Sequence, residues 1–131
     1  WQFSNNMVGA ASLYSNARDL IEYARAHFSP THHAALDKAF ADVSVDYYPR
    51  EKEAANIAWV TDTLGGQRIT YQVGYIGGYS SYIGFDKANQ NAVVVLQNSF
   101  NWSNYIGQAI LQNQVAKSSY TAGDERIKKA P

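Results

Sequence analysis

The chain has 131 residues, which suits one domain and leaves no room for two of ordinary size. Its composition, 46% hydrophobic and 17% charged, is that of a globular protein rather than a disordered one. Eleven basic residues balance eleven acidic ones, so nothing indicates a nucleic-acid partner or an anionic membrane surface, and no apolar run approaches the ~20 residues of a membrane-spanning helix.

Two helices are predicted near the N-terminus. Ser15 or Asn16 can cap the first one. The apolar residues behind this cap recur at helical spacing and form one stripe: Ala17, Leu20, Ile21, Ala24 and Phe28. Ser29 followed by Pro30 is typical of a second helix start, and we expect that helix to run to about residue 43.

The middle of the chain predicts an antiparallel meander. Residues 44–55 are polar, contain Pro49 and read as a connection. β-favouring residues then predict four strands: 57–61, 68–74, 79–85 and 92–97. The last strand is apolar enough that both of its faces should be covered. Gly74, Gly77 and Gly78 fall within five residues, which indicates special backbone dihedrals or close approach by a neighbour.

A closing helix and a polar tail complete the predicted fold. Asn101 or Ser103 is expected to cap the helix. Its expected buried stripe is Tyr105, Ile106, Ala109, Ile110 and Val115. Residues 1–116 would form the domain, and 117–131 a flexible tail. The fold class is α+β: an antiparallel sheet of about three to four strands, with two N-terminal helices and a C-terminal helix packed on it.

The sequence contains little that indicates a metal site or a bound cofactor. The chain has no cysteine, which excludes disulfides, thiolate metal sites and a cysteine nucleophile. His32 and His33 are adjacent, so on a helix they would not share a face, and no third ligand is obvious. We therefore predict no metal and no cofactor.

Three stretches, in this order, carry a resemblance to a known family. They are residues 9–20 (GAASLYSNARDL), 72–86 (QVGYIGGYSSYIGFD) and 91–99 (NAVVVLQNS). The first resembles a Gly-rich lead-in and a helix start, the second a motif-bearing strand with its following hairpin, and the third a final core strand. Together they resemble the C-terminal portion of serine β-lactamases and penicillin-binding proteins, of the class C β-lactamase, esterase and D-alanyl-D-alanine carboxypeptidase type.

The resemblance implies where a substrate would bind. Residues 68–78 would form the border strand of a reaction cleft, with Gln72, Val73, Gly74 and Ile76 at the substrate. The backbone N–H of Tyr75 would belong to the oxyanion hole, a role that does not depend on the side chain. Gln72 and Val73 depart from the family's Lys or His and its hydroxyl residue, so the motif is degenerate and classical β-lactam recognition is in doubt.

The nucleophile that the resemblance implies is missing. The family acylates a serine in a Ser-x-x-Lys motif, and no serine here has lysine three residues later. Tyr14-Ser15-Asn16 matches the letters of the family's Tyr-x-Asn motif, but its position favours a packed tyrosine followed by a helix cap. The chain also begins at Trp1. We therefore expect a processed product or a piece of a longer serine hydrolase, inactive by itself.

Two functions from different classes stay open. The first is one wall of an acyl-transfer site for a β-lactam, a peptide of the peptidoglycan type or an ester, in a periplasmic or secreted protein by family inference. The alternative is a stand-alone, non-catalytic binding domain that uses the tyrosine-rich strand 71–82, although core packing is the commoner use of such tyrosines. In either case, an unpaired 92–97 strand edge would favour a homo-oligomer.

Overall fold

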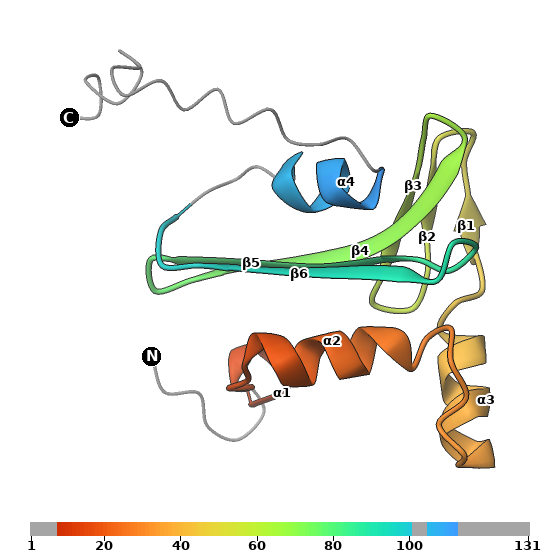
Figure 1. Cartoon of the computed structure of the whole chain (residues 1–131), viewed down its shortest axis with the longest axis horizontal. Coiled ribbons are helices and arrows are strands. Elements are labelled where there is room, and N and C mark those ends of the chain that lie inside the picture. The colour runs from red at the N-terminus through yellow and green to blue at the C-terminus, as the bar shows by residue number, and fades with distance from the viewer. Residues whose placement is uncertain (1–7, 101–104, 113–131) are drawn as a thin grey trace.

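The chain folds into three layers, with helices on both faces of a sheet (Figure 1). The computed structural model describes residues 8–100 and 105–112. Helix α2 (Ala17–Arg25) lies against one face of the sheet, and α4 (Tyr105–Leu111) lies against the other. The predicted α+β class is confirmed.

The sheet has six antiparallel strands rather than three to four. They follow the chain order across the sheet: β1 (Tyr48–Pro49), β2 (Glu53–Ala55), β3 (Val60–Leu64), β4 (Gln67–Ile76), β5 (Tyr79–Asp86) and β6 (Asn91–Gln97). The two additional strands, β1 and β2, lie in the stretch predicted to be a connection. Periodicity could not reveal them because they are short, and tertiary hydrogen bonds anchor them. The side-chain amide of Asn56 donates to the Val45 carbonyl at 3.0 Å and to the Asp46 carboxylate at 2.8 Å.

Two Gly-Gly turns set the register of the long strands. Gly65 and Gly66 join β3 to β4 with φ of 57° and 83°, and Gly77 and Gly78 join β4 to β5 with φ of 58° and 85°. Positive φ at both central residues defines the two-residue hairpin turn whose twist matches the strands, and glycine adopts it without steric penalty. The special dihedrals predicted for Gly77 and Gly78 are confirmed.

The helix starts agree with the sequence in one case and differ in the other. Asn16 caps α2 by accepting the backbone N–H of Asp19 at 3.1 Å. The second predicted helix, α3 (Ala34–Asp42), begins several residues after Pro30. The reason is local: the Asp37 carboxylate accepts both the backbone N–H of Thr31, at 2.8 Å, and its hydroxyl, at 2.7 Å, which holds residue 31 outside the helix. A short helix, α1 (Val8–Ala11), precedes α2.

The core consists of two clusters, one on each face of the sheet. On the α2 face Ala24, Trp59 and Phe85 pack together, and on the α4 face Ile69, Tyr82 and Leu111 do so. Strand β6 contributes to both, since it contacts α2 and α4, as predicted for an apolar strand covered on both faces.

The predicted stripe of the closing helix is largely wrong. The buried residues of α4 are Gly107, Ala109 and Leu111. Tyr105, Ile106 and Ile110 are exposed, and Val115 and the predicted caps lie outside the described residues, as does the predicted tail. In the described part of the chain, no helix is long and apolar enough to cross a membrane.

Candidate functional site

Strand β4 changes from an inner strand to an edge strand halfway along its length. The ladder with β3 ends at the pair Val60–Tyr71, whereas the ladder with β5 continues to Ile76. Within the described residues, the segment from Gln72 to Ile76 therefore has a strand on one side only. This half has the edge position expected of a cleft border. The beginning of the predicted border strand, residues 68–71, instead lies between two strands.

The register shows which peptide groups point out from this edge. In a two-residue hairpin the pair flanking the turn, here Ile76 with Tyr79, is hydrogen-bonded, and the pairs then alternate. The pairs of Val73 and Tyr75 with β5 are consequently of the non-hydrogen-bonded kind. Their N–H and C=O groups point away from β5, toward the edge. The backbone N–H of Val73 accordingly donates to a side chain, Gln72 Oε1, at 3.0 Å.

The Gln72 side chain closes the end of the β3–β4 ladder. Its Nε2 donates to the Ala58 carbonyl at 2.8 Å, while its Oε1 accepts the Val73 N–H. A side-chain amide carries the same donor and acceptor as a peptide group, so Gln72 continues the ladder for one further step. Both ends of this amide are occupied by protein groups. The predicted role of Gln72 at a substrate stays a prediction.

Gly74 is required by a close neighbour across the hairpin. A Cβ at this position would lie 2.6 Å from Ser81 Oγ, which itself donates to the Gly74 carbonyl at 3.4 Å. The close approach predicted for Gly74 is therefore confirmed. Val73 turns its side chain to the α4 face, into the cluster around Tyr82, and its backbone N–H is taken by Gln72 Oε1.

A groove of about 410 Å³ lies beside this edge, across the β4–β5 hairpin. Its lining residues come from the tip of the β4–β5 hairpin and the end of β6: Tyr79, Ser80, Ser81, Leu96, Gln97 and Asn98. The Ser80 hydroxyl is buried, 3.0 Å from Gln97 Oε1 and 2.9 Å from the Ser99 carbonyl. Sequence analysis missed Ser81 and Leu96 as neighbours of the site. Pairing the strands from the Gly-Gly turn would have placed Ser81 opposite Gly74, and Leu96 lies one strand further on, opposite Ser81.

The tyrosines of strand 71–82 divide between core and surface. Tyr71 and Tyr82 stack with ring centroids 5.7 Å apart, inside the α4-side cluster. Burial, together with the nearby Asp62 carboxylate, raises the pKa of Tyr71 to about 12. Tyr75 is half-buried, with its ring 5.5 Å from that of Phe100, and Tyr79 is exposed. Packing is thus the role of Tyr71 and Tyr82.

Other residues named from the sequence lie away from this edge. Asn16 is a helix cap, as expected, but the preceding Tyr14 is 91% exposed instead of packed. His33 is the N-cap residue of α3, and His32 has a φ of 64° in the preceding loop. In the described ranges, no three His, Cys, Asp or Glu residues gather as metal ligands. Sequence analysis also passed over the third histidine, His27, which the structure buries among aromatic rings.

These features define a protein whose antiparallel sheet is covered by helices on both faces and leaves half of one long strand, Gln72 to Ile76, as an edge among the described residues. The family model described as Beta-lactamase matches residues 1–117, which is most of the chain. The chain belongs to the β-lactamase family. A search of curated proteins and a search of solved structures found no match.

Proposed function

We propose that the edge of β4 from Gln72 to Ile76 is one wall of the acyl-transfer site of a serine hydrolase in the β-lactamase family. The observation that carries the proposal is the end of β3 pairing at Tyr71, which leaves this segment as an edge. Family membership supplies the reaction class, attack of a serine on an acyl group. The serine would come from outside this sequence, because no Ser-x-x-Lys occurs in it.

Tyr75 would act through its backbone. When a serine attacks an acyl carbon, the carbonyl oxygen gains negative charge, and fixed N–H donors stabilise that oxyanion. The alternation of the β4–β5 ladder directs the Tyr75 N–H away from β5, to the side on which a substrate would lie. Gly74 supports this geometry by letting Ser81 close onto the strand without a clash.

The proposed substrate class depends on the side chains of Gln72 and Val73. Glutamine carries no charge, and a charge-assisted bond to a carboxylate contributes about 1.5–3 kcal/mol against ~1 for a neutral one. The Gln72 amide is in addition engaged by Ala58 and Val73. This arrangement favours acyl donors that need no cationic contact here, an ester or an uncharged amide, over carboxylate-bearing β-lactams. By family, the protein would work in the periplasm or outside the cell. The unpaired outer side of β6 among the described residues is the basis for proposing that the chain pairs with itself there.

The first test uses the chain alone. We expect no hydrolysis of a chromogenic cephalosporin or of a p-nitrophenyl ester, because the sequence lacks the nucleophile. Turnover that co-purifies with the protein through two separate chromatographic steps would contradict this.

The second test removes the proposed N–H donor from the parent protein that supplies the serine. Tyr75→Pro deletes the N–H while leaving the β4–β5 ladder intact, because that N–H does not serve the ladder and proline is tolerated on strand edges. We expect kcat/KM to fall about 10²- to 10³-fold, the usual effect of losing one oxyanion donor. Tyr75→Phe keeps the N–H and should retain activity. Equal activity of the two variants would refute the assignment.

A further inference from the structure

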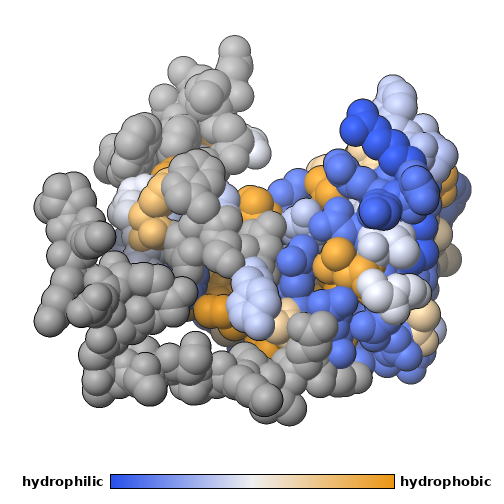
Figure 2. Space-filling model, turned by 90° about the horizontal axis from the view of Figure 1, so that it is seen from above, coloured by the Kyte–Doolittle hydropathy of each residue, from blue (hydrophilic) through white to orange (hydrophobic). Residues whose placement is uncertain are grey.

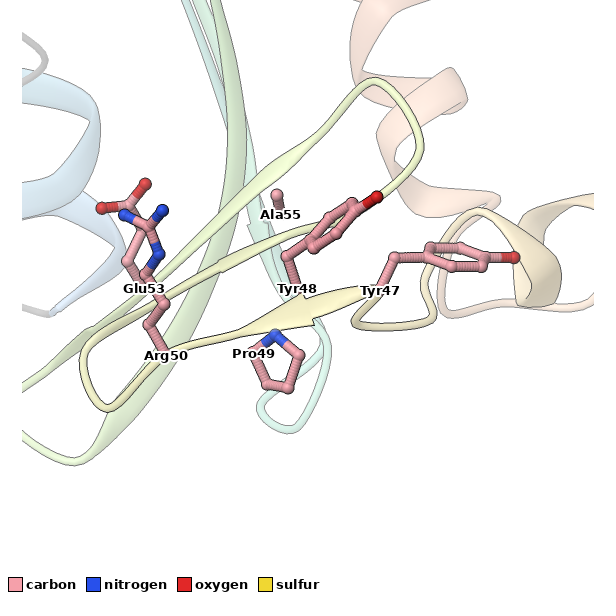
Figure 3. Close-up of a pocket in the computed structure, with 6 residues that line it drawn as sticks. All are labelled: Tyr47, Tyr48, Pro49, Arg50, Glu53 and Ala55. Atoms are coloured by element: carbon pink, nitrogen blue, oxygen red, sulfur yellow. The ribbon is translucent and has the colours of Figure 1, made fainter.

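A second hollow, of about 470 Å³, lies at the outer β1–β2 hairpin (Figure 3). It is lined by Tyr47, Tyr48, Pro49, Arg50, Glu53 and Ala55. Its volume falls in the ~300–1,000 Å³ range of small-ligand pockets. The stretch that forms it, residues 44–55, was predicted to be a polar connection.

Two of the lining residues, Tyr47 and Tyr48, have solvent-exposed side chains. Tyr47 is 52% exposed and Tyr48 is 73% exposed; the Tyr48 ring rises from β1 above Ala55, and the Tyr47 ring extends past the start of the strand (Figure 3). Ala55 is the strand partner of Tyr48, and its methyl group leaves space beside the ring. Exposed tyrosines present a flat apolar face together with a hydroxyl, a combination that binding surfaces use repeatedly.

A cation and an anion lie at the other end of the hollow from Tyr47 (Figure 3). The backbone N–H of Arg50 donates to the Glu53 carbonyl at 2.7 Å, which closes the β1–β2 hairpin and sets the two side chains side by side (Figure 3). Among the described residues, neither side chain has a hydrogen bond or an ion pair with another residue, in contrast to Arg68, which pairs with Asp46. The guanidinium offers up to five N–H donors and the carboxylate two acceptor oxygens.

We propose that the hollow formed by Tyr47, Tyr48, Arg50 and Glu53 binds a neutral oligosaccharide of flat, β-1,4-linked hexopyranose units. The C–H face of such a ring packs on a tyrosine face. Adjacent hydroxyls on the same ring can each donate to the carboxylate and accept from the guanidinium. The described residues supply donors and acceptors with no net charge, which disfavours an anionic or cationic ligand.

The surroundings support a polar ligand. Viewed from the α4 side, the described surface toward the β1–β3 end of the sheet is largely hydrophilic, with apolar residues set singly in it (Figure 2). By strand register Tyr48, Arg50 and Glu53 share one face of the sheet. On this face α4 packs on β5 and β6, and its Gln108 side chain donates to the Asp62 carboxylate of β3 at 3.5 Å, one strand away from Glu53. The sugar site stands independently of the acyl-transfer proposal, since it uses neither Tyr75 nor a nucleophile.

The test is a nuclear magnetic resonance titration of the isotope-labelled chain with cellotriose and with chitotriose. We expect saturable shifts confined to residues 47–55 for at least one of them. Tyr48→Ala and Arg50→Ala should each weaken binding tenfold or more. Tyr79→Ala removes an equally exposed tyrosine outside the hollow and should leave the affinity unchanged.

Several outcomes would overturn the proposal. They are the absence of shifts with both trisaccharides, shifts spread away from residues 47–55, or equal loss of binding in Tyr79→Ala. A proline-rich peptide could use the same tyrosines by a different recognition mode. Saturable binding of such a peptide without binding of either sugar would also reject it. Thermal melts of the three variants should match that of the parent chain, because the substituted side chains are exposed.

Discussion

His27 is the residue whose surroundings are hardest to reconcile with its chemistry. It is 3% exposed, and four aromatic rings surround the imidazole: Tyr23, Phe40, Trp59 and Phe85, the last stacked at 4.6 Å. Neither ring nitrogen has a hydrogen-bond partner among the described residues. Burial, together with the positive charge of Lys87, lowers the pKa of His27 to about 4. The folded protein therefore holds a neutral imidazole.

This environment predicts acid sensitivity. The pKa is about 4 in the folded chain and near 6.5 when unfolded, so the unfolded state binds the proton first. Stability should be complete above pH ~6.5 and fall as the pH drops toward 4, by up to about 3 kcal/mol. Urea unfolding at pH 7 and pH 4.5 measures the loss.

Two matched variants distinguish the contribution of His27 to this pH-dependent loss of stability from that of the carboxylates, which also titrate in this range. His27→Phe keeps an aromatic ring among the four that surround this position. It should reduce the loss of unfolding free energy between pH 7 and pH 4.5. His33→Phe, at an exposed position, should leave it unchanged. An equal pH dependence in all three proteins would mean that His27 does not carry it.

At the scale of elements, Tyr82 of β5 decides how α4 sits on the sheet. A Cβ on Gly107 would lie 2.2 Å from Tyr82 Cε1, and one on Gly84 would lie 2.5 Å from its hydroxyl oxygen. The ring fills a slot between two glycines and stacks on Tyr71. The rotation of α4 about its axis is therefore fixed by the contact of Gly107 with the Tyr82 ring. The spacing of apolar residues along the helix does not fix it alone.

Gly107→Ala should destabilise the protein even though alanine favours helices. The helix gain is up to about 1 kcal/mol, whereas inserting a methyl group into a packed contact costs about 1–3 kcal/mol. We expect a net loss of about 1–2 kcal/mol in the free energy of unfolding, measured by urea denaturation. Gly9→Ala, where the new Cβ meets nothing within 4 Å, is the matched control and should not destabilise. A more stable Gly107→Ala protein would show that α4 is not held by this contact.

The same contact explains which elements the sequence could predict. The four long strands and the α2 cap follow from local signals: β-branched and aromatic runs, Gly-Gly turns and an asparagine before an apolar stripe. The prediction of which side of α4 is buried was wrong because, in the sequence, Gly107 looks only like a residue of low helix propensity. Its role in making room for the Tyr82 ring is visible only in the structure. Strands β1 and β2 were missed because Asn56 anchors them through side-chain bonds, which have no periodicity. At the candidate site the position of Gly74 was foreseen from its neighbours, but the ladder-closing contact of Gln72 with Ala58 was not, since it depends on where β3 ends.

At the scale of the whole molecule, the sheet has two open borders besides the two-residue strand β1. One is the second half of β4, which is short and flanked by the Gln72 side chain. The other is β6, which pairs only with β5 along its full length. Within the described residues nothing pairs with its outer side. A seven-residue edge with five consecutive apolar residues is a template for another strand, whereas a five-residue edge interrupted by a side-chain amide is a poorer one.

This difference predicts that the chain associates with itself through β6. Sedimentation velocity over a range of concentrations should show a reversible dimer or higher oligomer. Leu96 is 47% exposed near the end of this strand, and Leu96→Lys places a charge on the edge without entering the core. It should weaken association at least fivefold, about 1 kcal/mol. Val45→Lys, a similarly exposed residue in the loop before β1, should have no effect. A strictly monomeric parent chain, or equal weakening by both substitutions, would mean that β6 is not the contact between copies. The β4 edge would then be the next strand to test, and Ile76→Lys is the corresponding substitution.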